Sequence, residues 1–320
     1  MMLVAGLIGL LIAWFTPTLA DAPGVLVRGA ALGKQEVDIL FGGDMMFDRA
    51  IRKAMRESGD DFIFSCLPKS LVNVDLFVAN LEGPITTHAS VSEGSTPGGE
   101  NNFTFTFPTS TASLLKRHNL TLVNLGNNHI MNFGREGLTQ TKEWLTQADV
   151  SYFGDPDAVE EDRVARTELH GIPFSFVNWS DWTPLDSSVS NGASFVGNPV
   201  VEQIRREAEA GRVTIVYTHW GEEYVPPTPQ MRQLAHSFVD AGAAIVIGSH
   251  PHVVQEHEVY NGKDIYYSLG NFIFDQYFSE EVREGLLVRV TFDREGVVAT
   301  EEIPTYLERD RRTCLKKVEE

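Results

Sequence analysis

The chain has 320 residues, 42% hydrophobic and 22% charged, which is typical of a folded globular protein long enough to bury a sizeable core. Its 44 acidic and 26 basic residues give a formal net charge of −18, which argues against nucleic acid as a partner because phosphate binding depends on Lys and Arg. Two cysteines, Cys66 and Cys314, support neither a disulfide framework nor a cysteine-based zinc site.

The N-terminal segment is predicted to direct export. Leu3 to Phe15 are continuously apolar or small, and the tripeptide TLA at 18–20 is a usable small-x-small cleavage site, although no Lys or Arg precedes the run. The run is short for a membrane span, which needs about 20 residues. Residues 1–20 are therefore interpreted as a signal peptide or an N-terminal membrane anchor, and 21–36 as a linker. A buried N-terminal helix is the alternative.

Strands and helices are then predicted to alternate in the main domain, residues 37–310. The predicted strands lie in the runs VDILFGGD, VDLFVANLEG, LTLVNLGNNH, VTIVYTHWGEE and AAIVIGSHPH, which begin at Val37, Val74, Leu120, Val213 and Ala243. Helical patterns cover Arg49 to Glu57, Thr109 to His118, Arg135 to Ala148, Val200 to Ala210 and Gln230 to Ala241. This alternation predicts an α/β fold with a largely parallel sheet.

The last part of the domain is predicted to contain strands without helices between them. HVVQEHEVY, KDIYYSLG and GLLVRVTFD are predicted strands with no helix between them, and Asn261-Gly262 is a hairpin signal between the first two. We therefore expect closing antiparallel strands and a sandwich of two sheets with helices outside. Residues 311–320 are predicted to be a C-terminal tail.

One long loop interrupts this pattern. Residues 87–102, THASVSEGSTPGGENN, offer almost nothing to bury. Long loops inside compact domains are usually functional or disordered. Because this one follows Glu82, a lid over a site and plain disorder are both open interpretations.

The strongest clue to function is that each of the five strand runs ends in side chains that bind metals. The side chains in question are Asp44, Glu82, Asn127, Asn128, His129, His219, His250 and His252. In open α/β sheets, ligands bind beyond the carboxyl ends of the strands. An oxygen and nitrogen donor set of this kind suits Mn, Zn or Fe.

Each of these residues has a plainer interpretation when it is taken alone. Asp44 could cap the helix near Arg49, since Asp is favoured at helix N-termini. A single His is more often structural than ligating, but their convergence at strand ends favours a site for one or two divalent ions. The other five histidines are predicted to be structural or solvated, namely His88, His118, His170, His236 and His257.

The order GGD, NLEG, NNH, HWGEE and SHPHVVQ, followed by SLGNFIFDQ at 268–276, resembles the bacterial capsule synthesis protein family, the CapA or poly-γ-glutamate capsule biosynthesis proteins. That family is similar in fold to the calcineurin-like metallophosphoesterases. The resemblance implies a four-layer αββα sandwich of two mixed sheets. It covers about Val37 to Asp275, most of the chain.

The weaker resemblance to the phosphoesterases themselves implies roles for individual residues. GNNH is similar to their Gly-Asn-His-Asp/Glu motif, which would make Asn128 a ligand and His129 the general acid. His219 matches their isolated strand-end histidine, and SHPH resembles their Gly-His-x-His motif, giving His250 and His252. With Asp44 and Glu82, these complete the predicted ligand set.

The chain also departs from the phosphoesterase pattern. Met45 and Met46 stand where that pattern has Asp-x-His, and Glu82 stands where it has Gly-Asp-x-x-Asp. The capsule family shares both departures, which leaves the number of metals and the reaction open. Asn132 replaces the usual Asp of the capsule family, a change expected either to shift the pKa of His129 or to remove a loop cap.

These observations predict an exported metal-dependent hydrolase-fold protein of capsule or poly-γ-glutamate assembly. Arg49 is the candidate catalytic cation beside His129, while Asn127, Glu223 and Asn271 are expected in substrate binding or around the ligands. The expected partners are an anionic envelope or capsule polymer and a membrane-bound synthesis complex. The alternatives are a non-catalytic polymer-binding accessory and a periplasmic phosphoesterase acting on a small ester.

Overall fold

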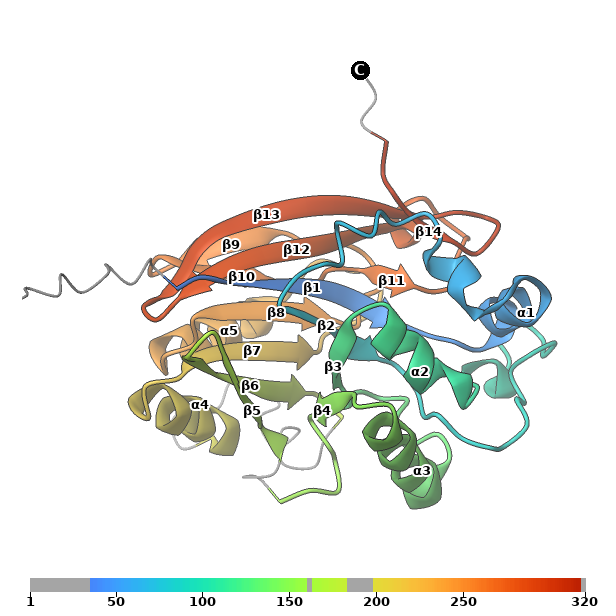
Figure 1. Cartoon of the computed structure of the whole chain (residues 1–320), viewed down its shortest axis with the longest axis horizontal. Helices are drawn as coiled ribbons and strands as arrows, with labels where there is room; N and C mark the ends of the chain where they lie inside the picture. Colours follow the sequence, from blue (N-terminus) through green and yellow to red (C-terminus); the bar gives the residue numbers. More distant parts are fainter. Residues whose placement is uncertain (1–34, 160–162, 183–197, 318–320) are drawn as a thin grey trace, which may run out of the picture. The chain divides into compact units, whose positions relative to one another are not determined.

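Two stacked β-sheets with helices on their outer faces form the protein, as the computed structural model shows for residues 35–159, 163–182 and 198–317 (Figure 1). The predicted four-layer αββα sandwich of two mixed sheets is confirmed. The predicted export segment and most of the predicted linker lie outside the described residues. Within the described ranges, no helix has the length and apolar character needed to cross a membrane.

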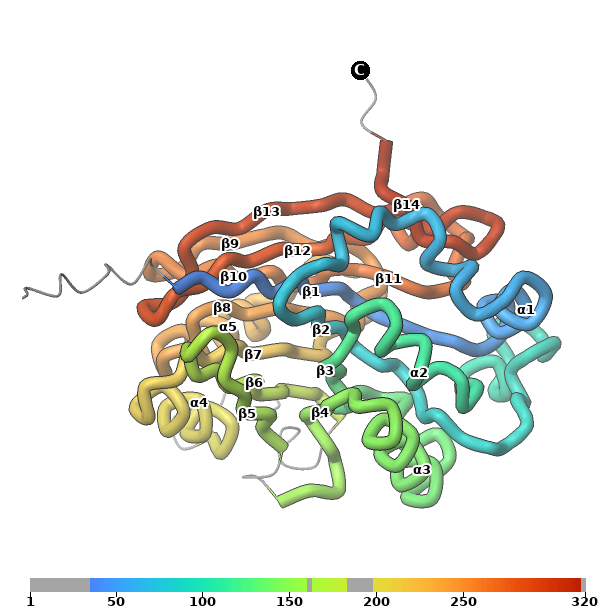
Figure 2. Tube along the Cα trace, viewed as in Figure 1, coloured from blue at the N-terminus to red at the C-terminus, as the bar shows by residue number. Residues whose placement is uncertain are grey.

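The first sheet has the strand order β14-β13-β12-β1-β2-β3-β4, with the short β11 also paired to β1. Its strands are β1 Val37–Met45, β2 Leu76–Leu81, β3 Leu120–Asn124, β4 Ser151–Phe153, β11 Asn271–Ile273, β12 Glu284–Asp293, β13 Gly296–Leu307 and β14 Thr313–Leu315. Strands β1 to β4 are parallel, whereas β12 runs antiparallel to β1. Strand β12, late in the sequence, thus lies beside β1, orange-red against blue in Figure 2.

The second sheet has the order β5-β6-β7-β8-β10-β9. Its strands are β5 Ala165–Leu169, β6 Ile172–Ser180, β7 Val213–His219, β8 Ile245–Ser249, β9 His257–Tyr260 and β10 Lys263–Tyr266. The β9–β10 hairpin turns at Asn261-Gly262, both at positive φ, as predicted. The central strand β6 was not predicted.

The observed bounds of all five predicted helices differ from the predicted bounds by at most one residue. The helices are α1 Arg49–Ser58, α2 Ser110–Arg117, α3 Gly134–Gln147, α4 Pro199–Glu209 and α5 Pro229–Asp240, with short 3-10 helices η1 Asp60–Phe64, η2 Glu100–Phe103 and η5 Glu281–Arg283. The first three helices pack on the first sheet, and α4 and α5 pack on the second (Figure 1).

Strand β1 shows why these elements form layers. Ile39 and Phe41 point into the core between the two sheets, while Leu40 points into the core beneath the helices of the first sheet. Because both of its faces are buried, the strand reads as a continuous apolar run rather than as an alternating one.

The long loop at 87–102 is anchored rather than free. The fully buried carboxylate of Asp48, at the N-terminus of α1, accepts hydrogen bonds from the hydroxyls of Ser90 and Ser92 and from the amide of Thr106, at 2.7 to 2.9 Å. Of the two interpretations left open, plain disorder is therefore wrong. The loop is packed against α1 near the carboxyl end of β1.

A single disulfide joins Cys66 to Cys314, across 248 residues of sequence. The sequence had supported no disulfide framework, and one crosslink is not a framework, but this pairing was not foreseen. It ties β14, which lies inside the predicted C-terminal tail, to the segment that follows η1. Since the cysteines are distant in sequence, only the packed sheet brings them together.

Candidate metal centre

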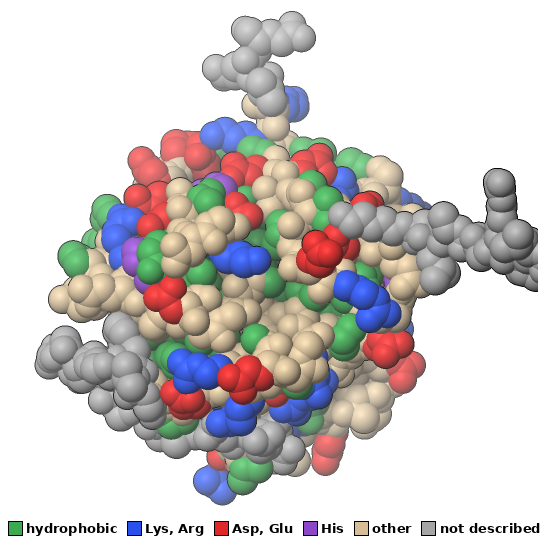
Figure 3. Space-filling model, turned by 90° about the vertical axis from the view of Figure 1, so that its left-hand side faces the viewer, with side chains coloured by type: hydrophobic (Ala, Val, Ile, Leu, Met, Phe, Trp, Pro, Cys, Tyr) green, Lys and Arg blue, Asp and Glu red, His purple; other side chains and the backbone are tan. Residues whose placement is uncertain are grey.

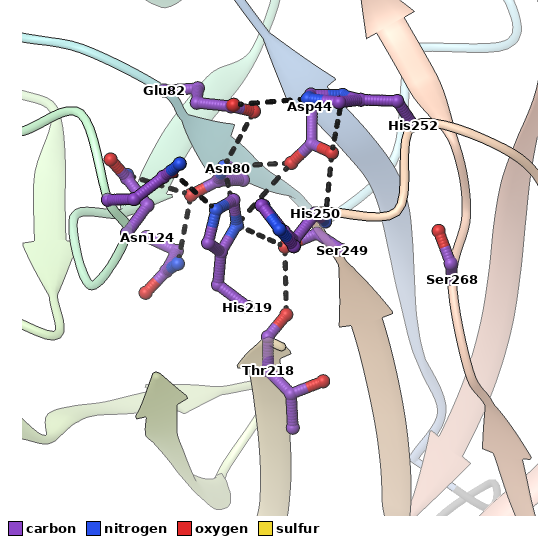
Figure 4. Close-up of polar contacts among 12 residues, drawn as sticks. Asp44, Asn80, Glu82, Asn124, Thr218, His219, Ser249, His250, His252 and Ser268 are labelled. Atoms are coloured by element: carbon purple, nitrogen blue, oxygen red, sulfur yellow. Dashed lines mark hydrogen bonds and ion pairs between the residues drawn. The ribbon is translucent and has the colours of Figure 1, made fainter. Parts of the chain in front are cut away.

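The carboxyl ends of β1, β2, β7 and β8 meet at one edge of the two sheets and bring their polar side chains together (Figure 4). The backbone at Gly43 lies so close to the backbone at Gly270 that a Cβ on residue 43 would be 1.9 Å from the Gly270 carbonyl oxygen. That same carbonyl accepts a hydrogen bond from the Asp44 amide, at 3.1 Å. Glycine here lets the 270 loop support the base of the site.

The centre of the cluster is a group of three buried side chains, Asp44, Glu82 and His252, whose ligand atoms lie within 4.8 Å of one another. His252 lies 3.6 Å from each carboxylate, through Nδ1 to Asp44 and through Nε2 to Glu82. The Oε1 atom of Glu82 is buried and has no hydrogen-bond partner among the described residues. An unsatisfied carboxylate oxygen in a dry site is costly unless a cation or a proton lies against it.

Asn271 sets the protonation of His252. Its amide nitrogen donates to the carbonyl oxygens of His252 and Val282 and to Gln276 Oε1, so its own oxygen is free to accept. That oxygen lies 2.9 Å from His252 Nδ1, which must therefore carry the proton. The lone pair of Nε2 then faces Glu82, which is the arrangement of a metal ligand held by an outer hydrogen bond.

A second group overlaps the first. His250 and His252 share it with Glu223, which is exposed and follows β7. His250 Nδ1 is buried without a hydrogen-bond partner in the described structure. Both histidines have positive φ, 97° and 58°, so the backbone is held in an uncommon conformation that turns them toward the same space. The residues present therefore fit one or two divalent ions.

His219 lies beside this cluster but is already satisfied. Its Nε2 lies 3.0 Å from Asn128 Oδ1, and its Nδ1 lies 3.2 Å from Asn80 Nδ2 and 3.0 Å from Ser249 Oγ. Because the amide nitrogen of Asn80 donates, Nδ1 accepts and Nε2 donates to Asn128. His219 could ligate an ion through Nε2 only by giving up this bond, whereas Asn128 Oδ1 keeps a second lone pair for an ion.

Burial dominates the ionisation of the cluster. Desolvation raises the pKa of Asp44 to about 6, against the lowering effect of hydrogen bonds from the His250 amide and Asn80. Desolvation and the neighbouring charge of Asp44 raise the pKa of Glu82 well above its usual range. Desolvation lowers the pKa values of His219 and His252 well below their usual range, so these rings are neutral and able to ligate.

His129 lies at the edge of the cluster. Its Nε2 is 4.0 Å from Glu82 Oε1 and its ring contacts Phe105, with centroids 4.4 Å apart. Asn132 Oδ1 accepts from the Phe105 amide and lies 3.2 Å from His129 Nδ1, so Nδ1 carries the proton. Asn132 therefore both orients His129 and fastens a loop. Burial lowers the pKa of His129 to about 4.

Arg49, the predicted catalytic cation, is paired with a carboxylate and packed over two aromatic rings. Its guanidinium donates to Asp275 Oδ1 at 2.5 Å and to the Asn102 carbonyl at 3.2 Å, and lies over the rings of Phe105 and Phe274. Those rings contact His129 and His252 respectively. Asp275 thus pairs with Arg49, whose charge still acts on Glu82, His129 and His252.

The remaining predicted residue, Asn127, stabilises the loop after β3. It donates to Leu81 O and Asn80 Oδ1 and accepts from the amides of His129 and Ile130, at 2.9 to 3.1 Å. Sequence analysis missed Asn80 itself, whose amide nitrogen lies 2.8 Å from Asp44 Oδ1. A polar residue inside an apolar strand, two positions before Glu82, was the available signal.

Comparison with known proteins shows the family. Residues 38–276 match the model of the bacterial capsule synthesis protein PGA_cap, so the chain belongs to this family. It is 27% identical over 274 residues to the PGA biosynthesis protein CapA of Bacillus subtilis, covering 82% of this chain and 70% of that one. It is 28% identical over 280 residues to the capsule biosynthesis protein CapA of Bacillus anthracis, covering 84% and 67%.

A solved structure shows similarity of fold alone. The crystal structure of a novel phosphatase from Mycoplasma pneumoniae aligns with a TM-score of 0.52 at 14% identity, covering 85% of this chain and 94% of that one. The shared fold agrees with the two-sheet sandwich predicted from the motifs.

Proposed function

We propose that this capsule-synthesis protein is an exported, metal-dependent hydrolase that acts on an anionic envelope or capsule polymer at the cluster of Asp44, Glu82 and His252. One observation carries the proposal. Glu82 Oε1 and the proton-free Nε2 of His252 face each other at 3.6 Å in a buried site, and Oε1 has no hydrogen-bond partner among the described residues. A divalent ion satisfies both atoms.

The chain's own residues would divide the work as follows. Asp44, Glu82 and His252 hold the first ion, and His250 with Glu223 can hold a second. Manganese, zinc or iron bound there would acidify a water molecule and polarise the scissile group. His129 is neutral at pH 7 and carries its proton on Nδ1, so its Nε2 accepts a proton before it can return one to a leaving group.

Arg49 has a more indirect role than a catalytic cation. Because Asp275 and the aromatic rings hold its guanidinium, it positions Phe105 and Phe274 against His129 and His252. Its charge also disfavours protonation of His129. The packing of Phe105 on His129 and the charge of Arg49 both help to keep the His129 imidazole neutral.

The second candidate is a non-catalytic accessory that holds an anionic polymer. The face at the starting end of β1 does not favour it, because acidic and basic side chains are interspersed there without a continuous basic strip (Figure 3). A metal ion bound at the ligand cluster, at the carboxyl end of β1, would give such a chain a cationic partner. A third candidate, a small-ester phosphatase, differs from the first only in substrate.

Export is supported by the apolar segment at 3–15, outside the described residues, and by the Cys66–Cys314 disulfide, since disulfides persist mainly in oxidising compartments. A fusion of residues 1–40 to a reporter that is active only after export tests it. An inactive reporter in a fusion that is produced at full length would contradict export.

The hydrolase proposal is tested by metal analysis of the purified protein and by chromogenic phosphomonoester and phosphodiester assays with Mn, Zn, Fe and Mg. We expect bound metal and metal-dependent turnover. Bound metal without turnover, together with altered surface polymer in a deletion strain, would favour the accessory. Turnover together with unchanged surface polymer would favour the small-ester phosphatase.

A further inference from the structure

An apolar groove opens directly beside the metal centre. It has a volume of about 650 Å³, and its walls include Tyr224, Pro226, Val254, Phe278 and Val282. Tyr224, Val254 and Phe278 are 41%, 38% and 67% exposed, which is unusual for large apolar side chains gathered in one place. Such a concentration on a protein surface marks a binding site more often than chance exposure.

The groove is continuous with the centre through the segment after β7. Glu223 belongs to the group of possible ligands, and the next residue, Tyr224, forms the wall of the groove. The Tyr224 amide donates to the Pro251 carbonyl at 2.9 Å, and its ring lies 6.1 Å from that of His252. The groove and the group of possible ligands therefore adjoin each other at Glu223 and Tyr224.

The walls of the groove are fixed in advance. Tyr224 Oη accepts from Gln276, at 2.9 Å, and Phe278 packs edge-on against Tyr224 with centroids 5.2 Å apart. Gln255 Nε2 donates to the Val225 carbonyl at 2.6 Å, which ties the two sides together. A preformed apolar groove binds without the ordering cost of a flexible one.

The charges around the groove exclude an anionic occupant. Its one basic lining residue, Arg232, is bound by Glu256 and lies 3.9 Å from Glu258, and Glu281 adds a further negative charge. No lining cation is left for an anion, whereas apolar surface is plentiful.

We propose that this groove binds an uncharged hydrocarbon portion of a substrate whose anionic group lies at the metal centre. The inference rests on the proposed function and narrows its substrate class to amphiphiles, or to polymers carrying an uncharged apolar group near the bond that is cleaved. The anionic remainder of such a molecule would lie outside the groove.

Binding of alkylphosphonates to the manganese-loaded full chain, measured calorimetrically, tests the proposal without requiring turnover. From methyl- to hexylphosphonate, we expect the affinity to rise about two- to fourfold for each added methylene, since each buried methylene contributes up to about fourfold. 6-Phosphonohexanoate, which ends in a carboxylate, should bind more weakly than hexylphosphonate.

Two variants locate the effect. Phe278→Ser should flatten the chain-length dependence and leave the affinity for methylphosphonate unchanged. Val259→Ser is the control, because it removes a comparably exposed apolar side chain, 62% exposed on β9 and outside the groove. It should change neither the chain-length dependence nor the affinity for methylphosphonate. If the unmodified chain binds methylphosphonate but its affinity does not rise with alkyl length, the groove does not bind hydrocarbon, and the proposed function is unaffected. No manganese-dependent phosphonate binding at all would overturn both.

Discussion

Replacing Asp44 by Asn should make the metal-free protein more stable at neutral pH and less stable in acid. Asp44 is fully buried, and burial raises its pKa from 3.8 to about 6. A carboxyl group whose pKa is raised on folding destabilises the folded protein when it is ionised. The free energy of unfolding therefore falls as the pH rises from about 4 through 6. The shift corresponds to about 3 kcal/mol at neutral pH.

The amide replacement removes that cost but loses a hydrogen bond. Two N–H donors, from the Asn80 side chain and the His250 backbone, point at the two carboxylate oxygens of Asp44. Asparagine offers one oxygen, which costs about 1 kcal/mol. We therefore expect metal-free Asp44→Asn to be about 2 kcal/mol more stable than the unmodified chain at pH 7.5, and about 1 kcal/mol less stable at pH 4.

Urea denaturation in EDTA at both pH values measures the difference, and the change of sign is the diagnostic feature. Manganese should then stabilise only the unmodified chain at pH 7.5, by about 2.7 kcal/mol at one hundred times the dissociation constant. A stability difference of the same sign and size at both pH values would refute the assigned ionisation of Asp44. Equal stabilisation of both chains by manganese would place the ion elsewhere.

Three further predictions concern single side chains. His252→Ala should abolish metal uptake measured by elemental analysis, because this ring lies 3.6 Å from both carboxylates, whereas His257→Ala, on a surface strand, should leave uptake intact. His129→Ala should keep the metal and lower any hydrolytic turnover about 10²- to 10⁴-fold; loss of metal would instead make His129 a ligand. Replacing Cys66 and Cys314 together by Ala should lower the free energy of unfolding by about 2–5 kcal/mol, with no further loss on adding reductant, and an unchanged denaturation midpoint would show that the crosslink does not form.

The sequence alone determined the layered fold and the edge at which the polar residues gather. The apolar runs ending at Asp44, Glu82 and His219 are local patterns, and the carboxyl ends of parallel strands meet at one edge of each sheet. The stacking of the two sheets then places the edge that carries His219 against the edge that carries Asp44 and Glu82. Helix bounds were predictable because caps and apolar periodicity are also local. The strand β6 escaped because its run IPFSFVNWS contains a proline, which is uncommon inside strands, and ends without a carboxylate or a histidine to mark it.

Tertiary structure decided how each polar group is used, because its partner lies far away in sequence. The side-chain oxygen of Asn271 accepts a hydrogen bond from Nδ1 of His252 and so fixes the tautomer of that ring, and Asp275 pairs with Arg49, which lies 226 residues earlier in the chain. Neither pairing leaves a local pattern, so the ion pair that holds Arg49 could not be predicted from the sequence. The ionisation of Asp44 was equally hidden, since desolvation depends on the whole surrounding packing and not on the neighbours of a residue in the chain.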